Sequence, residues 1–454
     1  MTLSRRELLI SGMATAATLA SGRRAETAPR APRRPTVDGK RLGTIFNNDI
    51  NNILWAASGD ATTAAEYQRA VYAILDLKPG LLAQNVGLPD AVIYPSDVAS
   101  RFDTHLEEVT AIVWPGGKAE ADNSSREAGA MRKLRDLDTD PLTLTIEACR
   151  KRGVPILASY RMNAEDFYHG TTLMSDFERA HPEWKIPGAN CLDPAVAQVY
   201  EHRMSIFREV AERYDIDGIE FDFRRWYHMV SDPLRNHPVL TRMVRETRQM
   251  LDDVARRKRR KKLLLGARVG PSLDSEPSPF LFPGIYYPEK PTNASCKELG
   301  LDVKTWVAEG LVDYLCPTLF CPSLPGLPLT REFVALAKGT QVGIYPTLFS
   351  PASWMHGVCE RTVSLTDKDQ RPLALYKDDL CGAALRIYEK GADGISTFNW
   401  YSHLRNARMP RLLSDAPAGD SSGSDAVQSS IYPLLRDPAA IRRYREQPWA
   451  VEGR

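Results

Sequence analysis

The sequence predicts an α/β protein of the (β/α)8 TIM-barrel class, with an N-terminal export signal and a short C-terminal extension. Strand-like apolar runs alternate with helical patterns at intervals of about 30–50 residues, which is typical of a parallel α/β architecture. Eight such runs occur in 454 residues, a length that suits one large barrel with extensions. Polar and charged residues follow most of the runs, as they do at the active-site edge of a barrel. An open sheet is the alternative, because the number of strands alone does not distinguish it from a closed barrel.

The predicted strands and helices alternate regularly after residue 38. The strands are expected at 44–52, 80–85, 155–161, 217–223, 263–269, 314–318, 341–346 and 394–399. Helical spacing of apolar residues predicts helices at 66–77, 140–152, 238–257 and 375–390, and one that ends near Gly310. Asp193-Pro194 is expected to begin the helix before the fourth strand, because Asp can cap a first turn and Pro fits its first position. Residues 88–127 contain Pro, Gly and Asp and predict a long irregular loop over the mouth of the barrel.

Both ends of the chain differ from the barrel in composition. Arg5 and Arg6 precede a mildly apolar run, a pattern that predicts a twin-arginine export signal. That run is too short and too weakly apolar to span a membrane, so we expect a periplasmic or extracellular protein without stable membrane insertion. We divide the chain into signal peptide and spacer (1–37), barrel (38–412), and linker with C-terminal tail (413–454). The tail is expected to carry a short helix near 437–446.

Charge and cysteine content exclude several classes. The 59 basic and 57 acidic residues nearly balance, so nothing points to nucleic acid or an anionic membrane as a partner. The seven cysteines form no Cys-x-x-Cys pair, which argues against a zinc or iron–sulfur site, and we expect no cofactor. Cys316 and Cys321 are close enough in sequence to pair, but buried free thiols are favoured. The seven consecutive cations at 256–262 precede the fifth strand, which favours a solvated loop on the stability face over a grip on an acidic polymer.

The fourth strand carries the strongest chemical signal, with Glu220, Asp222 and Arg224 at alternate positions. Because side chains alternate along a strand, these three face the barrel interior and its mouth. Unpaired buried charge is costly, so the groups are paired, hydrated or used. The Cα atoms of Glu220 and Asp222 are expected to lie roughly 6.5–7 Å apart. Repulsion between the two carboxylates raises the pKa of one of them, which leaves a protonated acid beside an ionised base. Glycoside hydrolysis requires this pair of groups. The alternative is an internal salt bridge of Glu220 or Asp222 with Arg224, Arg161 or Arg268.

Other strand ends add polar and aromatic candidates. Arg161 and Asn163 suit hydrogen bonds to sugar hydroxyls, and Asp166 follows them as a candidate acid. Trp400 and Tyr401 offer aromatic planes on which pyranose rings can stack. The expected catalytic residues are Asp222, Glu220 and Asp166. The expected substrate-binding residues are Arg161, Asn163, Arg224, Arg268, Asn47, Asp49, Asn85, Asn399, Trp400 and Tyr401.

Several stretches in the middle of the chain form a rather specific pattern. They are His-Pro-Glu-Trp at 181–184, Leu-Asp-Pro-Ala at 192–195, Tyr-Asp-Ile-Asp-Gly-Ile at 214–219, and the segments 306–314 and 391–395. In these, about residues 150–400 resemble the glycosyl hydrolase-like family 10 group of secreted bacterial barrels. The resemblance implies an eight-stranded barrel and action on glycosidic bonds.

The resemblance also ranks the candidate acids. Asp222 stands at the position of the family's strand-four Asp, which makes it the best single catalytic candidate. Glu220 has no such support, because members of the group usually carry His or a similar residue there, and it rests on the alternation argument. No Glu occurs near the end of the seventh strand, which argues against cellulase- or xylanase-type machinery.

Three functions fit these observations. The first is a hydrolase of oligo- or polysaccharides with Asp222 as nucleophile or base and Glu220 or Asp166 as acid. The second is a carbohydrate-binding barrel without turnover, whose carboxylates are locked to arginines. The third is a metal-dependent barrel enzyme in which His228 or His169 binds the metal together with the carboxylates. A lyase that acts on acidic sugars is also possible, because arginines at the mouth would bind uronates. The sequence favours the hydrolase.

Overall fold

The computed structural model shows residues 33–454 as one compact unit. It describes residues 35–37, 39–49, 63–105, 111–113, 119–121, 124–163, 168–224, 227–274, 293–319, 327–349, 373–398, 400 and 431–446. The predicted export signal and the linker at 415–429 lie outside these residues. No helix among the described residues is long and apolar enough to cross a membrane.

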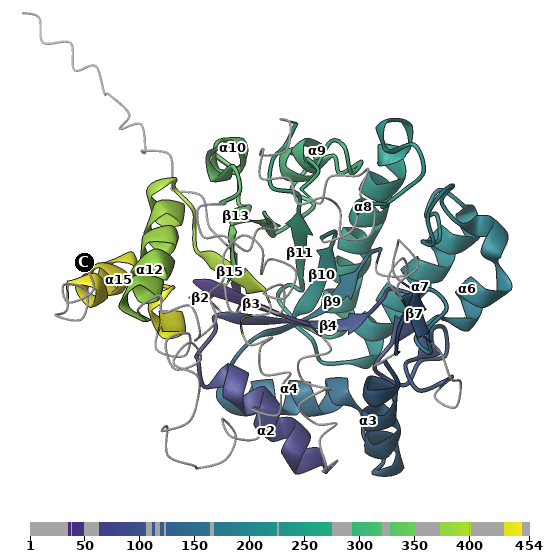
Figure 1. Ribbon diagram of the computed structural model, residues 1–454. Helices are drawn as coiled ribbons and strands as arrows, with labels where there is room; N and C mark the ends of the chain where they lie inside the picture. The colour runs from purple at the N-terminus through teal and green to yellow at the C-terminus, as the bar shows by residue number, and fades with distance from the viewer. Residues whose placement is uncertain are drawn as a thin grey trace, which may run out of the picture. The chain divides into compact units, whose positions relative to one another are not determined.

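The centre of the unit is a curled sheet of parallel strands with helices around it (Figure 1). The strands are β3 (Thr44–Asn48), β4 (Leu81–Gly87), β9 (Ile156–Arg161), β10 (Gly218–Asp222), β11 (Leu264–Val269), β12 (Tyr314–Pro317), β13 (Gly343–Ile344), β14 (Thr347–Phe349) and β15 (Ile395–Phe398). They pair in the order β13-β12-β11-β10-β9-β4-β3-β15-β14. β13 and β14 are the first and last strands of this order, and only Tyr345 and Pro346 separate them in the sequence. The two outermost strands of the sheet are therefore consecutive parts of the same segment. Each of the eight predicted strands overlaps an observed one, and the parallel α/β class is confirmed.

Helices connect the strands along the outside of the sheet. They are α2 (Ala64–Leu75), α3 (Ser124–Asp136), α4 (Pro141–Arg152), α6 (Asp176–Ala180), α7 (Ala197–Arg213), α8 (Pro233–Arg257), α9 (Val303–Ala308), α10 (Thr330–Leu336), α12 (Leu373–Glu389) and α15 (Pro438–Arg445). Their ends follow local chemistry. In α4, Asp140 accepts the backbone N–H of Thr143 at 2.9 Å, Pro141 occupies the first turn, and Gly153 ends the helix with φ 63°.

Alternation along the strands separates two apolar clusters. Ile45 and Leu81 belong to a small cluster, whereas their neighbours Phe46 and Leu82 belong to a much larger one with the helices. Successive strand residues point to opposite faces, so the small cluster fills the inside of the curled sheet and the large one fills the space beneath the helices. The inside therefore has an apolar floor, above which the inward positions become polar.

Aspartates at the starts of three strands stabilise the lower edge of the sheet. Asp217 accepts the backbone N–H of Ile156 on the neighbouring strand at 2.8 Å. Asp313 and Asp393 accept the N–H groups of their neighbouring strands at 2.9 Å each. The cations at 256–262 lie at this same edge, where several form ion pairs: Arg256 with Asp253, Arg257 with Glu212, Arg260 with Asp215 and Asp217, and Lys262 with Asp313. The run thus lies at the amino ends of the strands, on the face opposite their carboxyl ends, as predicted.

Residues 88–127 differ from the predicted irregular loop. They contain β5 (Ala91–Val92), β6 (Ser100–Arg101), β7 (Ala111–Val113), β8 (Ala119–Ala121) and the start of α3. The buried Tyr94 hydroxyl contacts that of Tyr160, an outward residue of β9, at 2.5 Å. The described residues 88–105 therefore pack against the outer side of the sheet rather than over the mouth. The prediction was wrong because strands of two or three residues leave no periodicity in a sequence.

Two helices begin at other residues than predicted. α7 begins at Ala197, because the side chain of Asp193 accepts the N–H of Ala195 at 2.9 Å and so stabilises a turn that precedes the helix. α8 begins at Pro233 and continues through Pro238, which was expected to lie at its start. A proline in the second turn of a helix removes one hydrogen bond but leaves the remaining turns intact.

The C-terminal helix and the cysteines agree with expectation where they are described. α15 corresponds to the helix predicted near 437–446, and its Ile441 is buried. Tyr432, which precedes it, packs against Phe46 with ring centroids 5.4 Å apart, so this segment joins the large apolar cluster. The cysteines at 149, 191, 296, 316 and 381 are buried free thiols. Cys321 lies outside the described residues.

Candidate active site

The upper ends of β9, β10 and β11 bring the predicted charged residues together. Asp222 is opposite Arg161 on one neighbouring strand and Arg268 on the other. Two residues lower on the strand, Glu220 is opposite Ser159. Residues paired in register project to the same face, so these side chains share the inner face, as alternation predicts. All are buried.

Glu220 is held by neutral donors. The Ser159 hydroxyl donates to Oε1 at 3.0 Å, and the Tyr314 hydroxyl donates to Oε2 at 2.7 Å. The side-chain amide of Asn47 also donates to Oε1. Burial, and then the negative charge of Asp222, raise the pKa of Glu220 to about 7. In the described part of the chain the salt-bridge alternative therefore does not hold for Glu220, which is not locked to an arginine, but it holds for Asp222, which pairs with Arg268.

Tyr314 reaches Glu220 because the intervening strand carries Gly266. A Cβ at position 266 would lie 2.0 Å from Cζ of the Tyr314 ring and 2.4 Å from its hydroxyl oxygen. Any larger residue would displace the tyrosine. The glycine thus permits one of the hydrogen bonds that hold Glu220.

We expect Glu220→Gln to flatten the pH dependence of stability. Folding raises the pKa of Glu220 from 4.5 to about 7, so the folded protein binds more protons than the unfolded chain in this window. The free energy of unfolding then falls as pH rises through it, by at most about 3 kcal/mol from this residue. Urea unfolding of both proteins at about pH 5 and about pH 8 measures the difference. Equal losses of stability in the two proteins would contradict the assignment.

Asp222 occupies the upper position on the same strand. Its Oδ1 accepts a hydrogen bond from Nε of Arg268 at 2.8 Å in a buried ion pair. The same oxygen accepts the backbone N–H of Arg224 at 3.0 Å. A carboxylate at the carboxyl end of a barrel strand is where barrel enzymes keep their catalytic groups.

Further charges surround this carboxylate. Arg161 forms an ion pair with Asp49. The guanidinium carbons of Arg268 and Arg161 lie 3.8 and 5.7 Å from the centroid of the Phe398 ring, so both cations gather around one aromatic side chain. We call the set formed by Asp49, Arg161, Asp222, Arg224 and Arg268 the upper charged layer.

Arg224 completes the upper charged layer. Its Nη2 donates to the side-chain oxygen of Asn293 at 3.2 Å. Burial, and then the positive charge of Arg268, lower the pKa of the Arg224 guanidinium to about 9. On other strands, the hydroxyl of Thr347 contacts those of Thr318 and Ser396 at 2.7 Å each.

The remaining predicted residues lie apart from this layer or beyond the described chain. Trp400 is fully buried and packs edge-on against Tyr432, with centroids 5.5 Å apart, so it is part of the core rather than a stacking platform. Asn85 is buried on β4 opposite Ser159, so it projects to the inner face at the level of Glu220, below the upper charged layer, and its amide donates to the carbonyl of Gly87 at 3.5 Å. Asp166, Asn399 and Tyr401 lie outside the described residues. Within the described stretches, no three His, Cys, Asp or Glu side chains are grouped to hold a metal ion.

Several residues that complete the site were not predicted from the sequence. Ser159 and Tyr314 occupy inward positions on their strands, and the alternation rule would have found them once the strand register was known. Phe398 is the last inward residue of β15. Asn293 follows a long connection after β11, and no sequence signal links it to Arg224.

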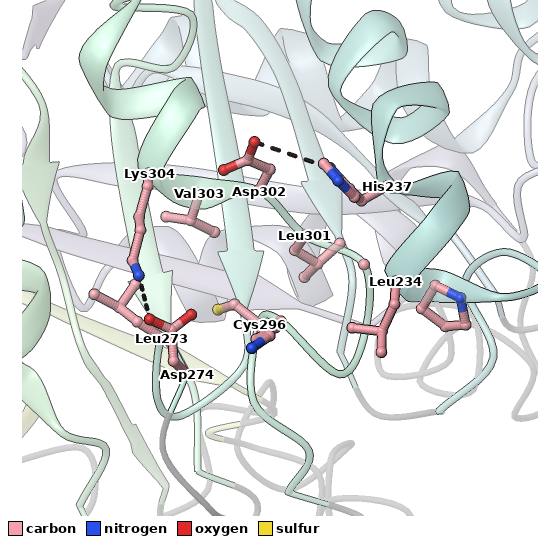
Figure 2. A pocket seen from close by; sticks show the side chains of 12 residues that line it. Leu234, His237, Leu273, Asp274, Cys296, Leu301, Asp302, Val303 and Lys304 are labelled. Atoms are coloured by element: carbon pink, nitrogen blue, oxygen red, sulfur yellow. Dashed lines mark hydrogen bonds and ion pairs between the residues drawn. The ribbon is translucent and has the colours of Figure 1, made fainter.

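A separate pocket of about 240 Å³ lies at the N-terminal ends of α8 and α9. Figure 2 shows Asp302 facing His237, at 3.9 Å, and Lys304 reaching Asp274. Leu234, Leu273, Leu301 and Val303 supply its apolar walls. Because each carboxylate in this pocket faces its own basic partner, the pocket offers no carboxylate pair for glycoside hydrolysis. The barrel interior is therefore the better candidate.

The fold and the buried carboxylates define a class of protein. A curled parallel sheet with acids at the carboxyl ends of its strands is the arrangement of barrel enzymes. Residues 83–338 match the family model described as Glycosyl hydrolase-like 10. The chain belongs to this family. No curated protein matches it.

Three of the solved structures that match this chain are distantly similar to it. A GH18 chitinase from Cycas revoluta in complex with allosamidin has 10% identity and a TM-score of 0.42, over 86% of this chain and 99% of that one. The PgaB (BpsB) glycoside hydrolase domain from Bordetella bronchiseptica has 12% identity and a TM-score of 0.42, over 86% and 100%. A cycloisomaltooligosaccharide glucanotransferase from Paenibacillus sp. has 12% identity and a TM-score of 0.36, over 67% of this chain and only 38% of its own length. Similarity at this level assigns no chemistry.

Proposed function

We propose that the protein is a glycosidase that cleaves glycosidic bonds of an oligo- or polysaccharide within a complete (β/α)8 barrel. Membership of a glycosyl hydrolase-like family supports the reaction class. The observation that carries the proposal is the contrast between two carboxylates on one inner face of β10. Asp222 is ion-paired with Arg268, whereas Glu220 is held by neutral donors and has its pKa raised to about 7.

This contrast matches the two roles that glycoside hydrolysis needs. One carboxyl group donates a proton to the leaving oxygen, and the other acts as nucleophile or activates water. Asp222 takes the second role. Glu220 or Asp166 supplies the proton, since Glu220 holds one near neutral pH and Asp166 follows β9 in sequence. Arg161, Asn163 and Arg268 orient the sugar.

A carbohydrate-binding barrel without turnover is the second candidate. It is favoured by the two ion pairs of the upper charged layer, Arg161 with Asp49 and Arg268 with Asp222, which neutralise carboxylates. Glu220 argues against it, because this carboxylate is held by neutral donors and is not locked to an arginine in the described part of the chain. Export by the twin-arginine route to the periplasm or beyond belongs to the same proposal and rests on Arg5 and Arg6.

A panel of soluble neutral and acidic glycans tests the proposal. The purified chain is incubated with each glycan, and released reducing ends are measured against heat-inactivated protein. We expect cleavage of at least one glycan. Binding of a glycan without any release across the panel would support the non-catalytic barrel instead. Neither binding nor release would contradict both functions.

A further inference from the structure

The pocket at the N-terminal ends of α8 and α9, called the α8–α9 pocket below, has an apolar interior (Figure 2). Cys296, Leu301 and Val303 line it as buried side chains, whereas Leu234 is 65% exposed and lies at its rim. The Cys296 thiol acts as an apolar group, because burial raises its pKa to about 12 and keeps it protonated. A cavity of about 150 Å³ can hold a benzene ring. A volume of about 240 Å³ therefore suits one substituted six-membered ring.

The charged side chains around the α8–α9 pocket face partners of opposite charge. Asp302 faces His237 at 3.9 Å, and Lys304 pairs with Asp274. Lys297 also lines the pocket but is exposed to water, where screening weakens its field. An uncharged ligand therefore fits the apolar interior best, since a charged group would lose its hydration there.

Backbone hydrogen bonds hold the α8–α9 pocket in shape. The N–H of Cys296 donates to the carbonyl of Ser272 at 2.9 Å, and the N–H of Lys297 donates to that of Leu273 at 3.0 Å. The N–H of Leu301 donates back to the carbonyl of Cys296 at 2.8 Å. The walls are therefore formed before a ligand arrives, which lowers the entropy that binding costs.

The α8–α9 pocket lies beside the candidate active site. Its residues come from the first turns of α8 and from the connection between β11 and α9, which follow the carboxyl ends of β10 and β11. The connection packs closely on Gly270, because a Cβ there would lie 2.7 Å from the carbonyl oxygen of Ala294. One residue earlier, Asn293 accepts a hydrogen bond from Arg224 at 3.2 Å. The short stretch from Asn293 to Cys296 thus joins the pocket to the candidate site.

We propose that the α8–α9 pocket is a subsite for an uncharged, ring-sized apolar aglycone, so that the substrate is an oligosaccharide with such a group at its reducing end. The inference rests on the proposed function, since an aglycone is defined by the glycosidic bond that joins it to the sugar. Apolar surface is stabilised by leaving water in proportion to the area that is buried. An acidic aglycone held by Lys297 and Lys304 is the alternative, and the experiment separates the two.

Calorimetric titration of the full chain tests the subsite. The probes are the phenyl, methyl and para-carboxyphenyl glycosides of cellobiose, maltose, xylobiose and diacetylchitobiose, in both anomeric forms. We expect at least one phenyl glycoside to bind at least tenfold more tightly than its methyl and para-carboxyphenyl counterparts, because only the phenyl ring buries a large apolar area without burying a charge. Equal binding of phenyl and methyl forms, tighter binding of the carboxyphenyl forms, or no binding of any phenyl glycoside would overturn the proposal.

A pair of leucine variants locates the binding. Leu234→Asp places a charge at the rim of the α8–α9 pocket, and we expect it to lose at least tenfold of the preference for the phenyl glycoside. The fold should tolerate this change, because Leu234 is 65% exposed and acidic residues suit the first turn of a helix. Leu137→Asp is the matched control, since Leu137 is 52% exposed and does not line the pocket. Unchanged preference in Leu234→Asp, with melting temperatures that show both variants folded, would sink the proposal.

Failure of this inference and failure of the proposed function give different results. Hydrolysis of phenyl and methyl glycosides alike, without a difference in affinity, leaves the glycosidase in place and removes the aglycone subsite. Binding of a phenyl glycoside that depends on Leu234, but without hydrolysis, keeps the pocket as the site of the apolar group and removes the glycosidase.

Discussion

Asp222→Asn is expected to lower kcat/KM on any cleaved glycan by about a thousandfold or more, because it removes the charge that attacks the sugar or activates water. The Asn oxygen can still accept the hydrogen bonds that Arg268 Nε and the Arg224 backbone now donate to Oδ1. The fold should therefore survive, with some loss of stability from the uncompensated arginine. Initial rates on one substrate, with circular dichroism as the check on folding, measure the effect.

Asp313→Asn is the matched control for this variant. Asp313 is also a buried strand aspartate that accepts from a neighbouring backbone N–H and pairs with an arginine, Arg248, but it lies at the opposite edge of the sheet. We expect it to lower the melting temperature while the rate constant of the remaining folded enzyme stays within about twofold. Comparable rate losses in both variants, or full activity in Asp222→Asn, would remove Asp222 from the mechanism.

Gly218→Ala is expected to destabilise the protein by about 3 kcal/mol or more, the largest stability effect that we predict. Gly218 has φ 152°, and a Cβ there would lie 2.0 Å from the carbonyl oxygen of Leu264 and 2.6 Å from its nitrogen. The clashing atoms are backbone of the neighbouring strand, so they cannot move without loss of the β10–β11 register. That register sets Asp222 opposite Arg268, so any folded variant should also lose activity.

Gly339→Ala is the control that separates the steric clash at position 218 from the cost of a positive φ angle. Gly339 also has a positive φ of 81°, but a Cβ there meets nothing within 4 Å. We expect it to cost only about 1–2 kcal/mol and to leave activity unchanged. Urea unfolding of both variants gives the comparison. Equal destabilisation would mean that packing against Leu264 is not what position 218 requires.

The sequence predicted most of the sheet because its strands are buried on both faces. Near-continuous apolar runs such as 263–269 are easy to recognise in the sequence, and turn residues such as Asp217-Gly218 mark where the strands begin. The elements that were not predicted are either very short or depend on tertiary packing. Residues 88–105 form strands too short for any periodicity, and α8 continues through Pro238 because its later turns provide the packing.

The candidate site was predictable only along single strands. The alternation of Glu220, Asp222 and Arg224 gave their inward direction, and the structure brings Arg161 and Arg268 to either side of Asp222. Contacts between strands depend on register, which one sequence does not contain. Hence the tyrosine that binds Glu220 was missed, and Trp400 was expected at the mouth although it packs into the core.

The most direct test of the central claim is a crystal structure of Asp222→Asn with an oligosaccharide that the wild-type protein cleaves. We expect a sugar ring within hydrogen-bonding distance of residue 222, with oxygens on Arg161 or Arg268. A sugar seated instead in the pocket between α8 and α9, with nothing bound at the upper charged layer, would contradict the account.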